Sequence, residues 1–258
     1  MPISLDLYHD VLGMMSGILV GFTLGLFGGG GSILAVPLLI NIVGVANAHV
    51  AIATSAVGVA ANAAVSLLLH ARHGTVQWKY AGLYCSTGVF FAFLGTLLGK
   101  AMDGPKLLIL FGGLMIVISI AMFRRRGMID ISPAKFSMRN APKVLSMGAG
   151  TGALSGFFGI GGGFLIVPGL MFSTGMPTVN AVATSLVAII AFGITTAVSY
   201  SFSGLVDWQL ALIFLTGGAL GAVAGCSTVN MLKNYQSLLN LLFAGLVLLV
   251  GSGMLFFS

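Results

Sequence analysis

Long apolar stretches separated by short polar ones dominate this chain. Residues 80–99 carry no charged side chain. Comparable stretches cover residues 48–69, 107–123, 178–202, 208–229 and 238–257. About 20 helical residues at roughly 1.5 Å each cross a hydrocarbon core of roughly 30 Å. The pattern therefore predicts an all-α, polytopic helical membrane protein.

The second half of the chain repeats the first. When Gly28 is laid on Gly159, five further pairs of glycines coincide, and after one deleted residue "ATS" at 53–55 falls on "ATS" at 183–185. Two copies of one unit joined by a linker are typical of secondary transporters. The predicted organisation is a first transmembrane repeat at 1–123, a basic linker at 124–143 and a second transmembrane repeat at 144–258.

Each repeat is predicted to contain a glycine-broken helical hairpin followed by three transmembrane helices. In the first repeat the apolar segments are 11–27, 32–44, 48–70, 79–100 and 105–123. Whether the two short segments cross fully or re-enter stays open. Both alternatives give an odd number of crossings, so the two repeats are predicted to be inverted relative to each other, with both termini outside the cell.

Composition and charge agree with this interpretation. Hydrophobic residues make up 58% of the chain and charged ones 6%, whereas about 25% of a soluble domain is charged. The linker holds six of the eleven Lys and Arg residues. Short basic loops mark the cytoplasmic side of membrane proteins. The position of these basic residues therefore explains the net charge of +6 without a nucleic-acid partner. It predicts a multi-pass protein of the cell (inner) membrane whose linker is cytoplasmic.

Two glycine-rich runs interrupt the apolar pattern, "GLFGGGGSILAVP" at 25–37 and "GFFGIGGGFLIVP" at 156–168. Glycine costs about 1 kcal/mol relative to alanine within a helix. Glycines four residues apart let membrane helices approach closely, and this packing role is expected for Gly17, Gly21, Gly25, Gly148, Gly152 and Gly156. Adjacent glycines face all sides of a helix, so each run is predicted to break it. Such a break persists at membrane depth only where the freed backbone groups meet protein, water or a ligand.

A nucleotide-phosphate loop does not explain these runs, because both the G-x-G-x-x-G spacing with its acidic residue and the G-K-[ST] element are missing. A purely structural hairpin and an anion site remain as alternatives. In the anion site, unpaired N–H groups of helices that start at Ser32 and Phe164 favour negative charge. Glycine lets the backbone approach the ligand. Pro37 and Pro168 are expected to kink the short helices or keep them mobile.

Polar side chains in the following helices complete the candidate site. The repeated "ATS" hydroxyls either bond back to their own helix or donate to an anion, and both alternatives stay open. Asn62 has Phe192 in its place in the second repeat, so its amide is expected to make the site asymmetric. The candidate substrate-binding residues are Gly28, Gly29, Gly30, Gly31, Ser32, Thr54, Ser55, Asn62, Gly159, Gly161, Gly162, Gly163, Thr184 and Ser185.

Asp, Glu, Lys and Arg are missing from the centre of every predicted span, and the chain has no glutamate. Proton relays and cation sites in membranes usually use such groups, so a cation pump is not indicated. Backbone dipoles and hydroxyls suit a small anion. With the cell interior negative, each exported negative charge gains about 2.3 kcal/mol per 100 mV. No metal or cofactor is expected, because Cys85 and Cys226 lack ligand or redox spacing.

In its two glycine runs and its two "ATS" helices, the sequence resembles the TauE/SafE family, also called the sulfite exporter family. The resemblance rests on the doubled glycine element followed by proline and on the doubled "ATS" helix, and it spans nearly the whole chain. Ser32 departs from the pattern, since the matched residue is Gly163. The resemblance implies an inner-membrane transporter of sulfite, thiosulfate, organosulfonates or related anions.

The sequence therefore predicts a secondary membrane transporter that exports small sulfur-containing anions. Uptake of another small organic anion and a non-transporting membrane scaffold stay open as alternatives. An enzyme is not expected, because a nucleophile with a neighbouring base is missing from the spans. The expected partners are a small anionic substrate and the lipid bilayer, and homo-oligomer formation stays open.

Overall fold

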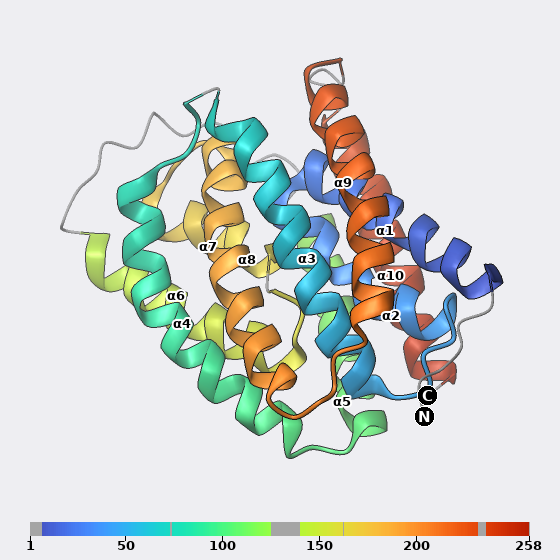
Figure 1. Cartoon of the computed structure of the whole chain (residues 1–258). Coiled ribbons are helices and arrows are strands. Elements are labelled where there is room, and N and C mark those ends of the chain that lie inside the picture. The colour runs from blue at the N-terminus through green and yellow to red at the C-terminus, as the bar shows by residue number, and fades with distance from the viewer. Residues whose placement is uncertain (1–6, 73, 125–139, 162, 232–235, 258) are drawn as a thin grey trace.

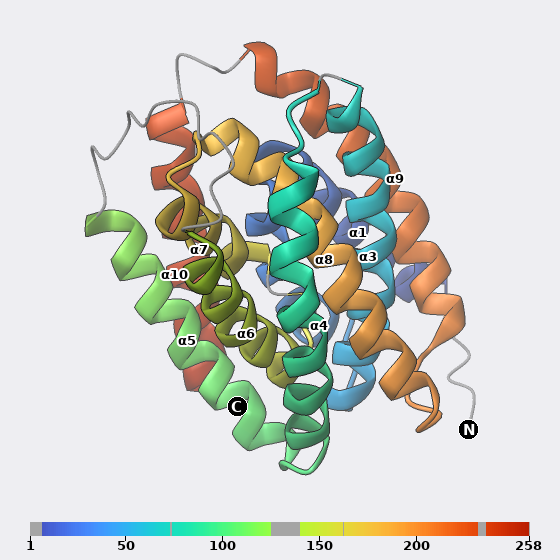
Figure 2. The same ribbon diagram turned by 90° about the vertical axis from the view of Figure 1, so that its left-hand side faces the viewer.

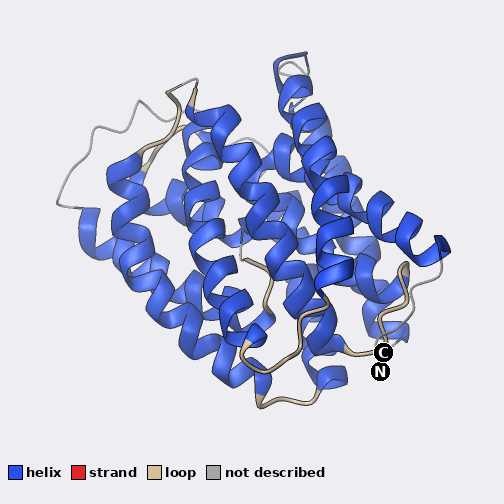
Figure 3. Ribbon diagram, viewed as in Figure 1, coloured by secondary structure: helices blue, strands red, loops and turns tan. Residues whose placement is uncertain are grey.

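The computed structural model describes residues 7–72, 74–124, 140–161, 163–231 and 236–257. Every regular element within these ranges is a helix, as Figure 3 shows. The all-α prediction is therefore confirmed for the described chain. Most of the predicted linker and Gly162 lie outside the described residues, and Gly30 is described only in its backbone assignment.

The helices follow the predicted segments closely in both repeats. The first repeat contains α1 (Leu7–Phe27), the 3-10 helix η1 (Gly28–Leu34), α2 (Ala35–Asn41), α3 (Ala48–Ala71), α4 (Trp78–Lys100) and α5 (Gly104–Arg124). The second repeat contains α6 (Ala141–Phe158), α7 (Gly163–Thr174), α8 (Thr178–Ser201), α9 (Trp208–Met231) and α10 (Gln236–Phe257).

Capping chemistry explains why the central helices begin where they do. The side chain of Asn47 accepts a hydrogen bond from the backbone N–H of His49 at 2.9 Å and caps α3. Pro177 precedes α8 at the equivalent position and supplies a preset φ instead. Gly44 and Gly175 turn the chain before each of these caps with φ of 83° and 70°.

Five of the described helices are long and apolar enough to cross a membrane. Their spanning parts are Tyr8–Phe27, Ala48–Ala71, Trp78–Lys100, Thr178–Ser201 and Trp208–Thr228. Large apolar side chains also cover the outer surface, including Phe90, Leu98, Leu212, Phe172 and Leu249. A protein in water rarely exposes such a surface. The structure therefore confirms a helical membrane protein.

The two repeats pack crosswise, with α1 on α9 and α4 on α6, which are equivalent pairs. α3 packs on α8 at the centre of the bundle (Figure 1), and α5 packs on α10 at its side (Figure 2). α3 and α8 run antiparallel, as Figure 1 shows. The central helices are also the most buried of the five spans, at 61% for α3 and 56% for α8 against 33% for α4.

Glycines line the two crosswise seams. A Cβ built at Gly21 of α1 would lie 1.9 Å from the carbonyl oxygen of Gly218 in α9. A Cβ built at Gly156 of α6 would lie 1.9 Å from the carbonyl oxygen of Ala92 in α4. Because these neighbours are backbone atoms, a methyl group has no room in either seam. The predicted packing role of the spaced glycines is confirmed.

Candidate functional site

The two glycine runs meet inside the bundle. A Cβ built at Gly29 would lie 2.3 Å from the Cα of Gly163, and one built at Gly163 would lie 2.3 Å from the Cα of Gly29. Both residues are buried. The backbones of the two repeats are therefore in direct contact at the segments that the sequence singles out, and only glycine permits that approach.

Equivalent glycines end the helices that lead into this contact. Gly28 ends α1 with φ of 61°, and Gly159 ends α6 with φ of 65°. This left-handed conformation strongly favours glycine at a helix end. Each glycine then lies against the central helix of the other repeat, Gly28 against Val182 of α8 and Gly159 against Ile52 of α3.

The two runs differ after that turn. In the first, residues Gly28–Leu34 form the 3-10 helix η1, and the hydroxyl of Ser32 donates to the carbonyl of Gly29 at 2.9 Å. The expectation that a helix starts at Ser32 is therefore wrong, because glycines accommodate the tighter 3-10 turns instead of leaving the chain non-helical. In the second, Gly161 has φ of 68° and α7 starts at Gly163, next to the predicted Phe164.

The two prolines lie in the short helices that follow. Pro37 is within α2, and Pro168 is inside α7. A proline has no N–H, so Pro168 leaves the carbonyl of Phe164 without its usual donor within the helix. Phe164 directly follows Gly163 of the glycine contact. A hinge or kink at these prolines stays a prediction.

The "ATS" threonines connect the two repeats. Thr54 Oγ1 accepts a hydrogen bond from the backbone N–H of Asp207 at 3.1 Å, and Thr184 Oγ1 accepts one from the backbone N–H of Gln77 at 3.0 Å. Asp207 and Gln77 directly precede α9 and α4. Thr54 of α3 is thus bonded to the segment that follows α8, and Thr184 of α8 is bonded to the segment that follows α3.

The neighbouring serines bond back to their own helices. Ser55 Oγ donates to the carbonyl of Ile52 at 2.9 Å, and Ser185 Oγ donates to that of Val182 at 2.7 Å. Of the two alternatives for these hydroxyls, back-bonding describes the serines. The threonine hydroxyls each accept one bond and keep a proton that they can donate.

Valine at Thr54 or Thr184 should destabilise the protein. Valine has nearly the shape of threonine, but it leaves the backbone N–H of Asp207 or Gln77 without its acceptor. We expect each substitution to cost about 1 kcal/mol, the scale of one lost hydrogen bond, because both bonds are partly buried. Thermal unfolding in detergent measures this cost. Serine at the same position keeps the hydroxyl and is the matched control, so equal losses for valine and serine would contradict the assignment.

Asn62 occupies a special position on α3. It is 0% exposed, and neither its Oδ1 nor its Nδ2 has a hydrogen-bond partner among the described residues. Its amide lies against Gly218 of α9, where a Cβ would be 1.8 Å from Nδ2. In the second repeat the ring of Phe192 lies against Gly88 of α4 in the same way, since a Cβ built at Gly88 would lie 2.2 Å from Cζ of Phe192. The two repeats therefore place different side chains at equivalent positions, and an asymmetric ligand site stays a prediction.

Ser66 is a polar residue that the sequence reasoning missed. It follows Asn62 by one helical turn on the same face of α3 and is 0% exposed. Its hydroxyl lies next to the thiol of Cys226 and interacts with it, and a thiol is a weak hydrogen-bonding partner. The spacing of four residues from Asn62 is the signal that could have found it.

The interior around these residues carries no charge. The buried polar groups of the described residues are the hydroxyls of serine, threonine and tyrosine and the amide of Asn62. Within the same ranges, no group of three His, Cys, Asp or Glu residues could hold a metal ion. Any ligand of this interior would therefore meet neutral dipoles.

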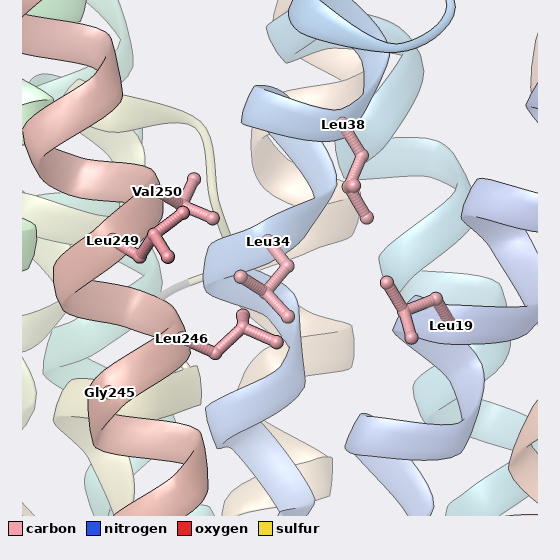
Figure 4. A pocket seen from close by; sticks show the side chains of 7 residues that line it. All are labelled: Leu19, Leu34, Leu38, Gly245, Leu246, Leu249 and Val250. Carbon is pink, nitrogen blue, oxygen red and sulfur yellow. The ribbon is translucent and has the colours of Figure 1, made fainter.

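Two cavities open elsewhere on the bundle, and both are apolar. One, of about 390 Å³, lies between α1, the η1–α2 segment and α10, and Figure 4 shows its leucine and valine side chains. Its lining residues are Leu19, Leu34, Leu38, Gly245, Leu246, Leu249 and Val250. The other, of about 550 Å³, lies along α3 and α8. Neither is lined by Asn62 or by a described glycine of the two runs. The backbones of Gly29 and Gly163 themselves are in close contact.

These features define a class of protein, a polytopic helical membrane protein with a doubled architecture and an uncharged, glycine-rich interior. The sulfite exporter TauE/SafE family matches residues 13–254, and the chain belongs to this family.

Relatives of similar length carry transporter names. A "probable membrane transporter protein" of Xylella fastidiosa (strain 9a5c) is 47% identical over 91% of this chain and 90% of its own length. The "probable membrane transporter protein YdhB" of Bacillus subtilis is 28% identical over 83% of this chain and 88% of its own. A Methanocaldococcus jannaschii protein of the same description is 34% identical over 71% of this chain and 70% of its own. No solved structure matches the chain significantly.

Proposed function

We propose that this protein is a secondary transporter that exports small sulfur-containing anions, such as sulfite, thiosulfate or organosulfonates, across the inner membrane. The observation that carries the proposal is the contact of Gly29 with Gly163 inside an uncharged interior. The family and the names of the relatives support membrane transport. The name of the family supports a sulfur anion as substrate.

Backbone groups are the recognition elements of the proposed site. Once the glycine contact opens, the first N–H groups of α7 and the backbone of η1 face the space between the repeats. Amide dipoles without side chains in the way suit a compact oxyanion with several acceptor oxygens. Because no Lys or Arg is buried among the described residues, the anion is held weakly enough to be released.

Opening and closing follow from two inverted repeats. The crosswise pairing of equivalent helices and the antiparallel course of α3 and α8 support the inversion. In this architecture one repeat rocks against the other around a fixed site. The glycine contact is then the surface that separates and closes, and Pro37 and Pro168 lie in the short helices that follow it in the chain.

The topology of the proposal is testable on its own. Reporter proteins fused after Ser258 and within the linker at 124–143 should lie on opposite sides of the membrane, with the linker in the cytoplasm. An odd number of crossings per repeat and the basic linker are the reasons. If both reporters fall on the same side, the inverted architecture is excluded.

Ligand-dependent stabilisation tests the substrate class. A ligand that binds only the folded protein stabilises it by about 2.7 kcal/mol at 100 times its dissociation constant. We expect sulfite, thiosulfate or a short sulfonate to raise the unfolding temperature of the purified protein, while chloride at equal ionic strength does not. Stabilisation by carboxylates alone would favour the alternative of an organic-anion carrier. Stabilisation by no small anion would favour the scaffold.

A further inference from the structure

We propose that sulfite is recognised in the first repeat, by Asn62 together with Ser66, as hydrogensulfite, the form that carries one proton. The inference rests on the proposed function, because it assigns a recognition point and a protonation state to the same substrate. It is carried by the unpaired, fully buried amide of Asn62.

An unpaired amide in this place is costly. Leaving a buried donor or acceptor without a partner costs about 1–3 kcal/mol for each group. Asn62 leaves its carbonyl oxygen and its amino group unpaired, and the fold makes space for them through Gly218. A polar side chain kept at such a cost points to a partner that arrives from outside the chain.

The second repeat shows that the fold itself does not require this cost. At the position of Asn62 it has Phe192, which stacks on Tyr84 with ring centroids 6.4 Å apart and planes at 23°. At the position of Ser66 it has Thr196, whose hydroxyl is 3.3 Å from that of Thr96. The second repeat therefore has an aromatic ring and a pair of hydroxyls at the two positions where the first repeat has the unpaired amide of Asn62 and the hydroxyl of Ser66.

Asn62 is also connected to the glycine contact along one helix face. Ser55, Asn62 and Ser66 follow one another at intervals of seven and four residues, which keeps them on one face of α3. Between them, Val59 reaches the second glycine run, since a Cβ at Gly161 would lie 3.3 Å from its Cγ1. The face of α3 that carries Ser55, Asn62 and Ser66 is therefore the face that contacts the second glycine run, through Val59.

The chemistry of an amide selects the form of the anion. An amide offers two N–H donors and one carbonyl acceptor. A fully deprotonated dianion satisfies the donors but sets one of its oxygens against Oδ1, with no proton between them. A singly protonated oxyanion, such as hydrogensulfite, donates its O–H to Oδ1 and accepts from Nδ2. The hydroxyl of Ser66 can donate to a third oxygen.

Sulfite flux into vesicles that hold the purified full chain tests this assignment. Asn62→Leu and Asn62→Phe should each cut the initial rate about tenfold or more, the scale of a lost hydrogen bond to a charged group. Phe192→Leu is the matched control in the second repeat and should keep the rate. Asn62→Leu should unfold at the wild-type temperature or above, because it removes unpaired groups. That result separates recognition from a structural role.

The pH dependence tests the protonated form. At fixed total sulfite, the wild-type rate should rise as pH falls through the range in which sulfite gains its proton, and sulfate should compete weakly. A folded Asn62→Leu protein with wild-type flux would overturn the assignment while leaving the transport proposal intact. A wild-type rate that follows the dianion instead would overturn the protonation state. No flux of any sulfur anion in the wild type would overturn the proposed function itself.

Discussion

Replacing Gly156 by alanine should nearly abolish the folded protein, whereas alanine at Gly150 of the same helix should be tolerated. A Cβ at Gly156 would lie 1.9 Å from the carbonyl oxygen of Ala92, 2.7 Å from its carbonyl carbon and 2.8 Å from its Cα. All three are backbone atoms of α4, so no rotamer change makes room, and α6 must separate from α4. Overpacking costs about 1–3 kcal/mol or more, and here we expect the upper end.

Gly150 is a stringent control because it lies on the same helix with nothing within 4 Å of its built Cβ. Alanine there should improve helix propensity by up to about 1 kcal/mol. The amount of membrane-inserted protein and its unfolding temperature in detergent measure both variants. Gly21→Ala in the equivalent seam should reproduce the loss. Equal yields for Gly156→Ala and Gly150→Ala would show that the seam is not tightly packed.

Alanine at Gly163 should reduce sulfite transport to the level of empty vesicles. Its Cβ would lie 2.3 Å from both the Cα and the carbonyl oxygen of Gly29, so the two repeats cannot close on each other. The α1–α9 and α4–α6 seams do not include Gly163 and should keep the protein folded. We expect the free energy of unfolding to fall by about 1–3 kcal/mol. The matched control is Gly113→Ala in α5, where nothing lies within 4 Å. Wild-type flux in a folded Gly163→Ala protein would contradict a functional role for the contact.

Much of the fold can be predicted from the sequence, because its strongest signals are local or repeated. Apolar stretches of the right length mark the spans, and helices begin and end near Gly, Pro and Asn residues. The seams could be predicted because glycines four residues apart occupy one helix face whatever the partner is. The internal repeat also shows which segments of the two halves are equivalent. The structure then packs α1 on α9 and α6 on α4, which are equivalent pairs.

The candidate site was less predictable, because its contacts join residues far apart in the chain. Nothing near Thr54 indicates that Asp207 is its donor, since that bond depends on how two repeats pack. Glycine propensity predicts a break at Gly28–Leu34, yet tertiary packing holds that segment as a 3-10 helix. A serine in a helix normally bonds back to its own helix, so the spacing of Ser66 from Asn62 gains meaning only once the structure shows that both side chains are fully buried.

Potential-driven sulfite flux tests the central claim most directly. The purified chain is placed in vesicles, an ion gradient sets the membrane potential, and labelled sulfite is followed across the bilayer. The account predicts flux that saturates with sulfite concentration and accelerates when the receiving side is positive, since each negative charge gains about 2.3 kcal/mol per 100 mV. Flux no faster than in empty vesicles, or robust transport of a cation with none of any sulfur anion, would contradict it.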